Sequence, residues 1–337
     1  MHEEYLNIER ISLKHEISYP QTGLVIADEK VAKLYPDLFF TDASLPTLYL
    51  RAGERQKSWN QCLKVYDFLA EHQASREDII HVFGGGTVCD LAAFAISTFK
   101  RGCRLYLYPS TLLAMVDAAI GGKTGINYLG FKNYIGSFYP AERIFIYPPF
   151  LQSLATAELR QGYAEMLKCS MLNEDLLLPE LDRIFPPRDQ LILDYARYKM
   201  GICAQDPYDN NQRQLLNFGH TFGHALESFS NYKIKHGDAI VLGMYIACEY
   251  SFVEELSSAE EWEQYRDWIS QYPIPKAALS FLSDTALSDM LPQMLQDKKW
   301  DNQLRLVVPV HGEIKIIEVE IQADQADKQR KNNAHPA

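Results

Sequence analysis

The first half of the chain alternates short apolar runs with stretches of helical periodicity. The runs that have the length and composition of buried strands are 23–27, 48–50, 78–83 and 104–108. The stretches with helical periodicity are 29–35, 58–71 (with Trp59, Leu63, Tyr66 and Leu69 on one side) and 90–99. Strands that alternate with helices are typical of a parallel sheet covered on both faces. Residues 1–150 are therefore predicted to form one α/β domain.

The pattern changes after Pro148-Pro149. From Ala157 to about Met294, apolar residues recur at helical spacing with few strand-like runs. Near the end, 304–310 and 314–319 flank a His-Gly-Glu turn and predict a hairpin. Residues 151–322 are thus predicted to form a second, mostly α-helical domain. The polar, aromatic-free residues 323–337 are expected to be a flexible tail.

Composition narrows the classes of function. The chain of 337 residues has 33 Lys and Arg against 44 Asp and Glu, a net charge of −11. Such an acidic protein is a poor general binder of nucleic acid or of an anionic membrane. The chain has no run long enough to span a bilayer and no signal-peptide core, and its six cysteines form no CxxC motif. We expect a soluble, cytoplasmic protein in which an anionic substrate meets a local basic cluster.

Three glycines, Gly84-Gly85-Gly86, separate a predicted strand from a predicted helix. Glycine there lets the backbone approach a phosphate, and a helix N-terminus supplies unpaired N–H groups. The full G-x-G-x-x-G fingerprint is absent, so a plain tight turn remains the alternative. Asp90 near the helix start favours dinucleotide binding.

Lys123 follows two glycines, and Lys132-Asn133 lies in the turn-rich stretch 130–136. The stretch before Lys123 lacks the first glycine of a P-loop, so that motif is excluded. A solvated lysine is the alternative for Lys132, but its place among turn residues favours a binding loop.

Glu165 and Lys168 are three residues apart on one predicted helix and share a face. A surface ion pair is the ordinary outcome of this spacing. Three histidines follow within 17 residues, His220 and His224 one helical turn apart and then His236. No glutamate follows His220, which excludes the HExxH motif. Histidines with a carboxylate fit a catalytic zinc site that keeps an open position, whereas a structural histidine pair is the alternative.

Basic residues accompany these motifs. They are Arg101, Lys123, Lys132, Lys168, Lys199 and Arg213. In an acidic chain, such a set favours a site for a phosphate and a carboxylate over a merely solvated face.

Nine segments, in order, resemble the 3-dehydroquinate synthase family of the sugar phosphate cyclase superfamily. They are Gly53–Ser58, Gly84–Phe94, Lys100–Gly102, Pro109–Asn127, Lys132–Pro140, Ala164–Lys168, Leu215–Glu227, His236–Met244 and Asp297–Lys299. Three positions depart from the family pattern. Cys89 stands where the family loop usually has glycine, and its extra Cβ is expected to crowd the helix start or the pyrophosphate. Asp209 stands where glutamate is usual, and Arg51 where proline is common.

The resemblance implies a Rossmann-like N-terminal domain that holds NAD and a helical C-terminal domain that holds one zinc or cobalt ion. The implied metal ligands are Glu165, His220 and His236. The implied substrate residues are Arg101, Asp117, Lys123, Lys132, Asn133, Lys168, Lys199, Arg213, Asn217, His224 and one of Lys298 and Lys299. The implied cofactor residues are Asp28, Glu54, Lys57, Gly85, Gly86, Asp90, Ser110, Thr111, Asp117, Lys123, Lys132, Phe150 and Ser153.

The implied reaction converts 3-deoxy-arabino-heptulosonate 7-phosphate to 3-dehydroquinate and phosphate. It proceeds by transient oxidation with NAD, β-elimination of phosphate, re-reduction and aldol cyclisation, and belongs to the shikimate pathway. The alternatives are another sugar phosphate cyclase, an iron-type polyol dehydrogenase or a non-enzymatic sugar-phosphate binder. The resemblance also implies a homodimer.

Overall fold

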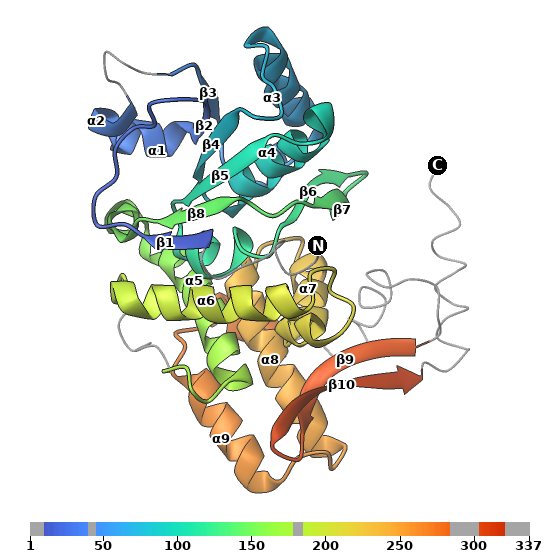
Figure 1. The fold of residues 1–337 in the computed structure, drawn as a ribbon. Coiled ribbons are helices and arrows are strands. Elements are labelled where there is room, and N and C mark those ends of the chain that lie inside the picture. The colour runs from blue at the N-terminus through green and yellow to red at the C-terminus, as the bar shows by residue number, and fades with distance from the viewer. Residues whose placement is uncertain (1–9, 40–44, 178–184, 284–302, 321–337) are drawn as a thin grey trace. The chain divides into compact units, whose positions relative to one another are not determined.

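The structure is a computed structural model, and residues 10–39, 45–177, 185–283 and 303–320 are described (Figure 1). The chain packs into two compact units. Unit 1 comprises Met1–Gly162 and Phe185–Gln212, and unit 2 comprises Tyr163–Ile184 and Arg213–Ala337. The predicted tail 323–337 and the segment Asp297–Lys299 lie outside the described residues.

A six-stranded parallel sheet forms the centre of unit 1. Its strands, in spatial order, are β1 (Ile11–Leu13), β8 (Arg143–Ile146), β5 (Arg104–Pro109), β4 (Ile79–Gly84), β2 (Leu24–Asp28) and β3 (Thr47–Leu50). Every described pair in this sheet runs parallel. The four strands expected from apolar runs all form, which confirms the parallel α/β architecture. The short strand β1 and strand β8 were not predicted.

Helices cover both faces of this sheet. On one face, the Phe83 and Tyr108 rings stack with centroids 4.0 Å apart, and Phe39 of α2 (Pro36–Phe39) packs edge-on against Phe83 at 5.1 Å. The opposite face carries Leu107, which lines a pocket together with Ala93 of α4 (Gly86–Thr98). Alternate residues of β4 and β5 thus face different helical layers, because strand side chains alternate.

The remaining helices of unit 1 are α1 (Glu29–Leu34), α3 (Trp59–Glu71) and α6 (Asp189–Gln205). The predicted side of α3 is wrong at Trp59 and Leu63, which are 44% and 42% exposed, whereas the predicted Leu69 is buried. Helix α3 buries Leu69 together with Cys62, Val65 and Phe68. Val65 lies three or four residues from each of the other three, and this side of α3 packs on α4.

The stretch 130–136 is not a loop. Strands β6 (Lys123–Tyr128) and β7 (Phe131–Phe138) form an antiparallel hairpin whose turn contains Leu129 and Gly130, both with positive φ. Gly136 faces Gly125 across the pair, and a side chain on Gly136 would lie 2.5 Å from the Thr124 carbonyl oxygen. The glycines that suggested turns therefore allow two strands to approach closely.

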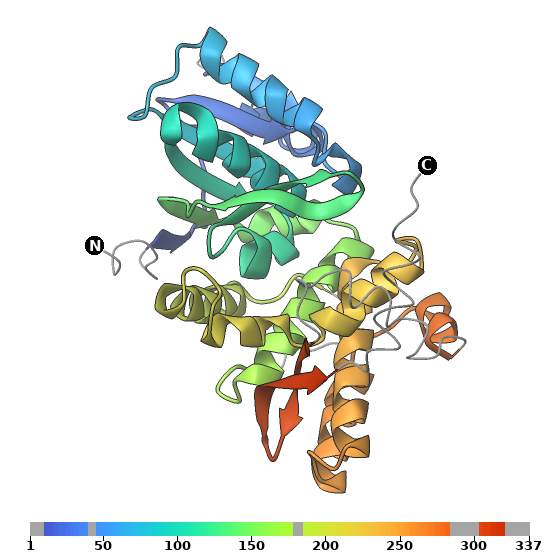
Figure 2. The ribbon, with the colours of Figure 1, turned by 90° about the vertical axis from the view of Figure 1, so that its right-hand side faces the viewer.

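Unit 2 is mostly helical, as the periodicity predicts. Its helices are the second part of α5 (Thr156–Leu172), then α7 (His220–Phe229), α8 (His236–Val253), α9 (Ala259–Ser270) and α10 (Lys276–Ser283). Strands β9 (Gln303–Val310) and β10 (Glu313–Glu320) form the predicted antiparallel hairpin. This hairpin packs against α8 (Figure 2).

All six cysteines are buried and free. Among the described residues, none of the helices has both the length and the apolar character that crossing a membrane requires.

Candidate functional site

The glycine turn in unit 1 joins β4 to α4. Gly85 is the N-cap of α4, and the helix begins at Gly86, four residues earlier than predicted. A Cβ on Gly85 would lie 2.9 Å from Thr111 Cγ2, and one on Gly86 would lie 3.0 Å from Ala118 Cβ. Glycine is required here by close neighbours rather than by a positive φ. The positive, N-terminal end of this 13-residue helix therefore lies directly after the C-terminal end of β4.

Lys57 links two of the candidate residues. Its side chain is 4% exposed, and its Nζ lies 2.7 Å from the Asp90 Oδ2 atom. The same ammonium group donates to the Asn133 side-chain oxygen. Burial raises the pKa of Asp90, and the Lys57 charge opposes that rise. The three side chains come from α4, from the hairpin and from the turn before α3, so they hold these elements together around a buried cation.

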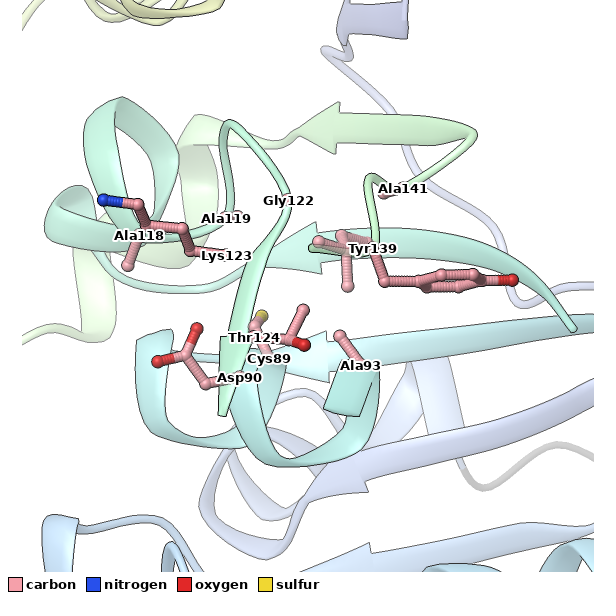
Figure 3. A pocket seen from close by; sticks show the side chains of 11 residues that line it. Cys89, Asp90, Ala93, Ala118, Ala119, Gly122, Lys123, Thr124, Tyr139 and Ala141 are labelled. Atoms are coloured by element: carbon pink, nitrogen blue, oxygen red, sulfur yellow. The ribbon is translucent and has the colours of Figure 1, made fainter. Parts of the chain in front are cut away.

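Cys89 leaves the start of α4 intact. Its backbone N–H donates to the Gly85 carbonyl at 3.0 Å, and its Sγ lies 3.4 Å from the Gly84 oxygen. The side chain lines a pocket together with Asp90 and Lys123, and Figure 3 shows Tyr139 at the other end of that pocket. The crowding of the helix start that the extra Cβ suggested does not occur.

Two further lysines of unit 1 are each paired with a carboxylate. Lys123 Nζ forms an ion pair with Asp209, and Lys199 Nζ, from α6, pairs with Asp117 and donates to its carbonyl oxygen at 2.9 Å. Asp209 reaches Lys123 although its side chain is one methylene shorter than the usual glutamate. Its backbone has φ 58°, a left-handed conformation that aspartate tolerates better than most residues.

Several predicted cofactor residues have structural partners in unit 1. Asp28, at the end of β2, accepts from the Lys30 N–H at 2.9 Å, and burial raises its pKa. Glu54 accepts from the Asn127 amide at 2.8 Å. Ser110 donates its N–H to the Gly84 oxygen, and Thr111 accepts from the Ala114 N–H.

The other predicted residues of unit 1 are less closely grouped. Phe150 is 1% exposed and packs edge-on against Tyr35 and Tyr147, and Ser153 accepts from the Tyr35 hydroxyl. Lys132 lies on β7, half-buried. Arg101 is exposed in the turn after α4 with φ 67°, a left-handed backbone.

In unit 2, three glycines let α7 and α8 cross at close range. A Cβ on Gly243 would lie 2.1 Å from the Gly219 carbonyl oxygen, and one on Gly223 would lie 2.8 Å from Ile240 Cδ1. Gly219 also has φ 77° as the N-cap of α7. The crossing places His220 and His236, the first residues of the two helices, with ring centroids 5.6 Å apart.

Glu165 faces these two histidines from α5. Its Oε1 atom lies 3.8 Å from His220 Nε2 and 3.6 Å from His236 Nε2. This oxygen is buried and has no hydrogen-bond partner among the described residues. A buried carboxylate oxygen without a partner is costly, and two imidazole nitrogens face the same space. One carboxylate and two imidazoles are the donor set of a catalytic zinc site, so these residues fit a divalent metal ion.

The protonation of this cluster is set by its charges. Burial would raise the pKa of Glu165, but Lys168 and the two histidines outweigh burial and hold that pKa well below its usual value. Burial and the Lys168 charge lower the pKa of His220 well below 6.5, which leaves a neutral imidazole. Burial lowers the pKa of His236, but the carboxylates of Glu165 and Glu227 outweigh it and raise the pKa to about 10. Without a cation, His236 therefore carries the positive charge between the carboxylates.

Lys168 is not part of a surface ion pair. Its side chain and that of Glu165 are each 1% exposed, and Lys168 Nζ pairs with the second oxygen, Oε2, of Glu165. Arg213 is also buried, on the short 3₁₀ helix Gln212–Asn217 that Asn217 ends. The His224 ring lies 5.3 Å from that of His220, so both residues of the pair reach one cluster.

Sequence reasoning missed Glu227. Its Oε2 atom lies 3.2 Å from His236 Nδ1, and its side chain is 5% exposed. The signal was present in the sequence, because Glu227 lies three residues after His224 and seven after His220 on one helix, on the face that carries both histidines.

The chain is similar over most of its length to known proteins. Models of the 3-dehydroquinate synthase N-terminal and C-terminal domains match residues 47–161 and 162–300. A 3-dehydroquinate synthase of Prochlorococcus marinus (strain MIT 9312) is 33% identical in an alignment 331 residues long, which covers 93% of this chain and 89% of that protein.

Two solved structures share the fold. One is 2-epi-5-epi-valiolone synthase from Streptomyces hygroscopicus with NAD⁺ and Zn²⁺ bound (TM-score 0.78, 21% identity, 96% of each chain). The other is 2-deoxy-scyllo-inosose synthase complexed with carbaglucose-6-phosphate, NAD⁺ and Co²⁺ (TM-score 0.75, 21% identity, 97% of this chain and 93% of that one). The fold is therefore that of the sugar phosphate cyclases. The two domain matches and the 33% identity define the family more narrowly. The chain belongs to the 3-dehydroquinate synthase family.

Proposed function

We propose that the chain converts 3-deoxy-arabino-heptulosonate 7-phosphate to 3-dehydroquinate and phosphate. Membership of the family indicates which reaction to expect, and one observation of the site gives the main support for it. The buried Glu165 Oε1 has no hydrogen-bond partner among the described residues and faces the Nε2 atoms of His220 and His236. Burying a carboxylate oxygen without a hydrogen bond costs free energy. A protein that only bound sugar phosphates, without catalysis, would have no need of this arrangement.

Glu165, His220 and His236 would hold one zinc or cobalt ion, and the turn at Gly85 and Gly86 would hold the pyrophosphate of NAD at the N-terminus of α4. When bound, the ion supplies Lewis-acid polarisation of a substrate hydroxyl, and NAD supplies a transient oxidation. The proposed NAD-binding and metal-binding domains are residues 1–150 and 151–322.

The chain's own residues orient the anionic substrate. Lys123, Lys199 and Lys168 are each held by a carboxylate, so their ammonium groups are placed before a substrate arrives. Arg213 adds a buried guanidinium, which suits a carboxylate or phosphate. His224, beside the proposed ligand His220, is the candidate for moving a proton at a substrate hydroxyl.

The test is phosphate release by the purified chain loaded with NAD and with zinc or cobalt. The substrates are the heptulosonate 7-phosphate, a heptulose 7-phosphate that lacks the carboxylate, and glucose 6-phosphate. We expect turnover of the first only, without accumulation of NADH, because the reduction step regenerates NAD. Turnover of glucose 6-phosphate but not of the heptulosonate would assign the chain to another cyclase activity. Stoichiometric NADH would assign it to a polyol dehydrogenase. The homodimer and the cytoplasmic location stay predictions.

A further inference from the structure

His236 lies between two buried carboxylates, one at each ring nitrogen. Its Nε2 atom is 3.6 Å from Glu165 Oε1, and its Nδ1 atom is 3.2 Å from Glu227 Oε2. The first distance is too long for a hydrogen bond, whereas the second is within hydrogen-bond range. The ring therefore bonds to Glu227 and turns its other nitrogen toward Glu165 and His220.

His220 is oriented by the same kind of contact. Its Nε2 atom faces Glu165, and its Nδ1 atom lies 3.2 Å from the Phe218 carbonyl oxygen. An imidazole that binds a metal through Nε2 carries its proton on Nδ1, and the acceptor at Nδ1 fixes both the tautomer and the ring plane. The acceptor is a neutral carbonyl for His220 and a carboxylate for His236.

We propose that Glu227 is a positioning residue of the metal centre, which accepts the Nδ1–H of His236 and holds Nε2 toward the ion. The inference rests on the proposed metal ligation by Glu165, His220 and His236. A charged acceptor makes the imidazole a stronger electron donor than a carbonyl does. His236 is also the more exposed ligand, at 32% against 17% for the side chain of His220, so it depends more on a fixed partner.

The same side chain takes part in a second group of possible ligands. Atoms of His224, Glu227 and His236 all lie within 4.8 Å of one another. A second ion there would have to displace the proton shared by His236 Nδ1 and Glu227. The positioning role and a second metal site thus predict different numbers of bound ions.

The experiment compares zinc affinity, by competition with a chromophoric chelator, and the visible absorption of the cobalt form. Glu227→Gln keeps an acceptor oxygen but removes the charge, and Glu227→Ala removes the acceptor. Glu249→Gln is the control, because Glu249 is exposed on α8, the helix that carries His236. His220→Ala is the reference for loss of a ligand.

We expect one ion per chain in the wild type and in the Glu227 and Glu249 variants, wild-type behaviour of Glu249→Gln, and loss of zinc binding in His220→Ala. Glu227→Ala should weaken zinc binding by about 10- to 100-fold and change the cobalt spectrum, with a smaller effect for Glu227→Gln. If Glu227→Ala does not fold, the zinc affinity of Glu227→Gln tests the proposal, and we expect it to lie between the affinities of the wild type and of His220→Ala. Wild-type affinity in the folded Glu227 variants, with loss in His220→Ala, overturns the role of Glu227 alone. Wild-type affinity in His220→Ala overturns the metal site itself. Two ions per wild-type chain would make Glu227 a ligand instead.

Discussion

Burial changes what an ion pair does in this protein. Glu165 and Lys168 are three residues apart in α5, and Glu263 and Arg266 have the same spacing in α9. The side chains of the first pair are each 1% exposed, whereas those of the second are 54% and 47% exposed. A buried charge that loses its partner keeps its desolvation cost, while an exposed charge is solvated again.

Lys168→Ala should therefore lower the free energy of unfolding of the metal-free protein by about 3 kcal/mol. Arg266→Ala should lower it by less than about 1 kcal/mol, because the Glu263 carboxylate remains in water. Urea unfolding in the presence of a chelator measures both values. Equal losses would show that burial of the Lys168 pair carries no special energetic weight.

At the scale of single residues, the sequence predicted which side chains belong to the cluster better than it predicted how deeply they are buried. The spacing of His220 and His224 indicated one shared face, and the two rings do meet. The burial of Lys168 could not be predicted, because three-residue spacing is equally common in surface pairs. The role assigned to Glu227 depends on the crossing of α7 and α8, which no local pattern encodes.

The closeness of α7 and α8 depends on glycines, and this gives a prediction at the scale of the element. Gly243→Ala would place a Cβ 2.1 Å from the Gly219 carbonyl oxygen, a backbone atom that cannot rotate away. We expect the helices to separate, with a loss of about 1–3 kcal/mol in the free energy of unfolding. His220 and His236 would separate with them, so zinc affinity should fall at least tenfold. Denaturation and chelator competition measure the two effects.

Gly201→Ala is the matched control. Gly201 lies within α6, and nothing lies within 4 Å of an added Cβ there. Alanine should leave zinc affinity unchanged and stabilise the helix by about 0.5–1 kcal/mol. A similar loss of zinc affinity in both variants would contradict the role of the crossing.

Helices and strands were predictable from the sequence where most of their residues are buried, because burial gives them a recognisable apolar pattern. The strands β2, β4 and β5 are mostly apolar, and the sequence predicted their bounds to within one residue. The hairpin β6–β7 was missed because every residue of β7 is exposed or half-buried and the strand contains Lys132, Asn133 and Gly136. Trp59 and Leu63 of α3 were wrongly expected to be buried, because apolar residues with the same helical period lie on two sides of this helix and only packing on α4 decides which side is covered.

At the scale of the whole molecule, His81 should make stability depend on pH. This buried histidine on β4 contacts the Tyr108 hydroxyl and the Thr22 carbonyl oxygen, both at 3.1 Å. Burial lowers its pKa from 6.5 to about 4. Between these two values the unfolded chain binds the proton and the folded chain does not. Stability contributed by neutral His81 is therefore complete above pH 6.5 and is lost as pH falls toward 4.

His81→Gln removes this dependence. The variant should be less stable than wild type at pH 7, and the gap should narrow by up to about 3 kcal/mol as pH falls from 6.5 to 4. Urea unfolding across that range measures the gap. The control is His72→Gln, whose side chain is exposed, and its gap to wild type should stay constant. A His81→Gln gap that does not change with pH would rule out the depressed pKa.

The chain crosses between its two compact units at 162/163, 184/185 and 212/213, and the first crossing lies inside α5. No single cut therefore yields both units whole. A fragment that ends near residue 150 would lack α6, which packs on β1 and supplies Lys199 to Asp117. Domain shuffling, split reporters and fusion at a presumed linker all need separable modules. Here an exchange of one unit between related chains would have to replace two separate segments at the same time. Recombination between relatives is therefore expected to leave the region that encodes both units intact.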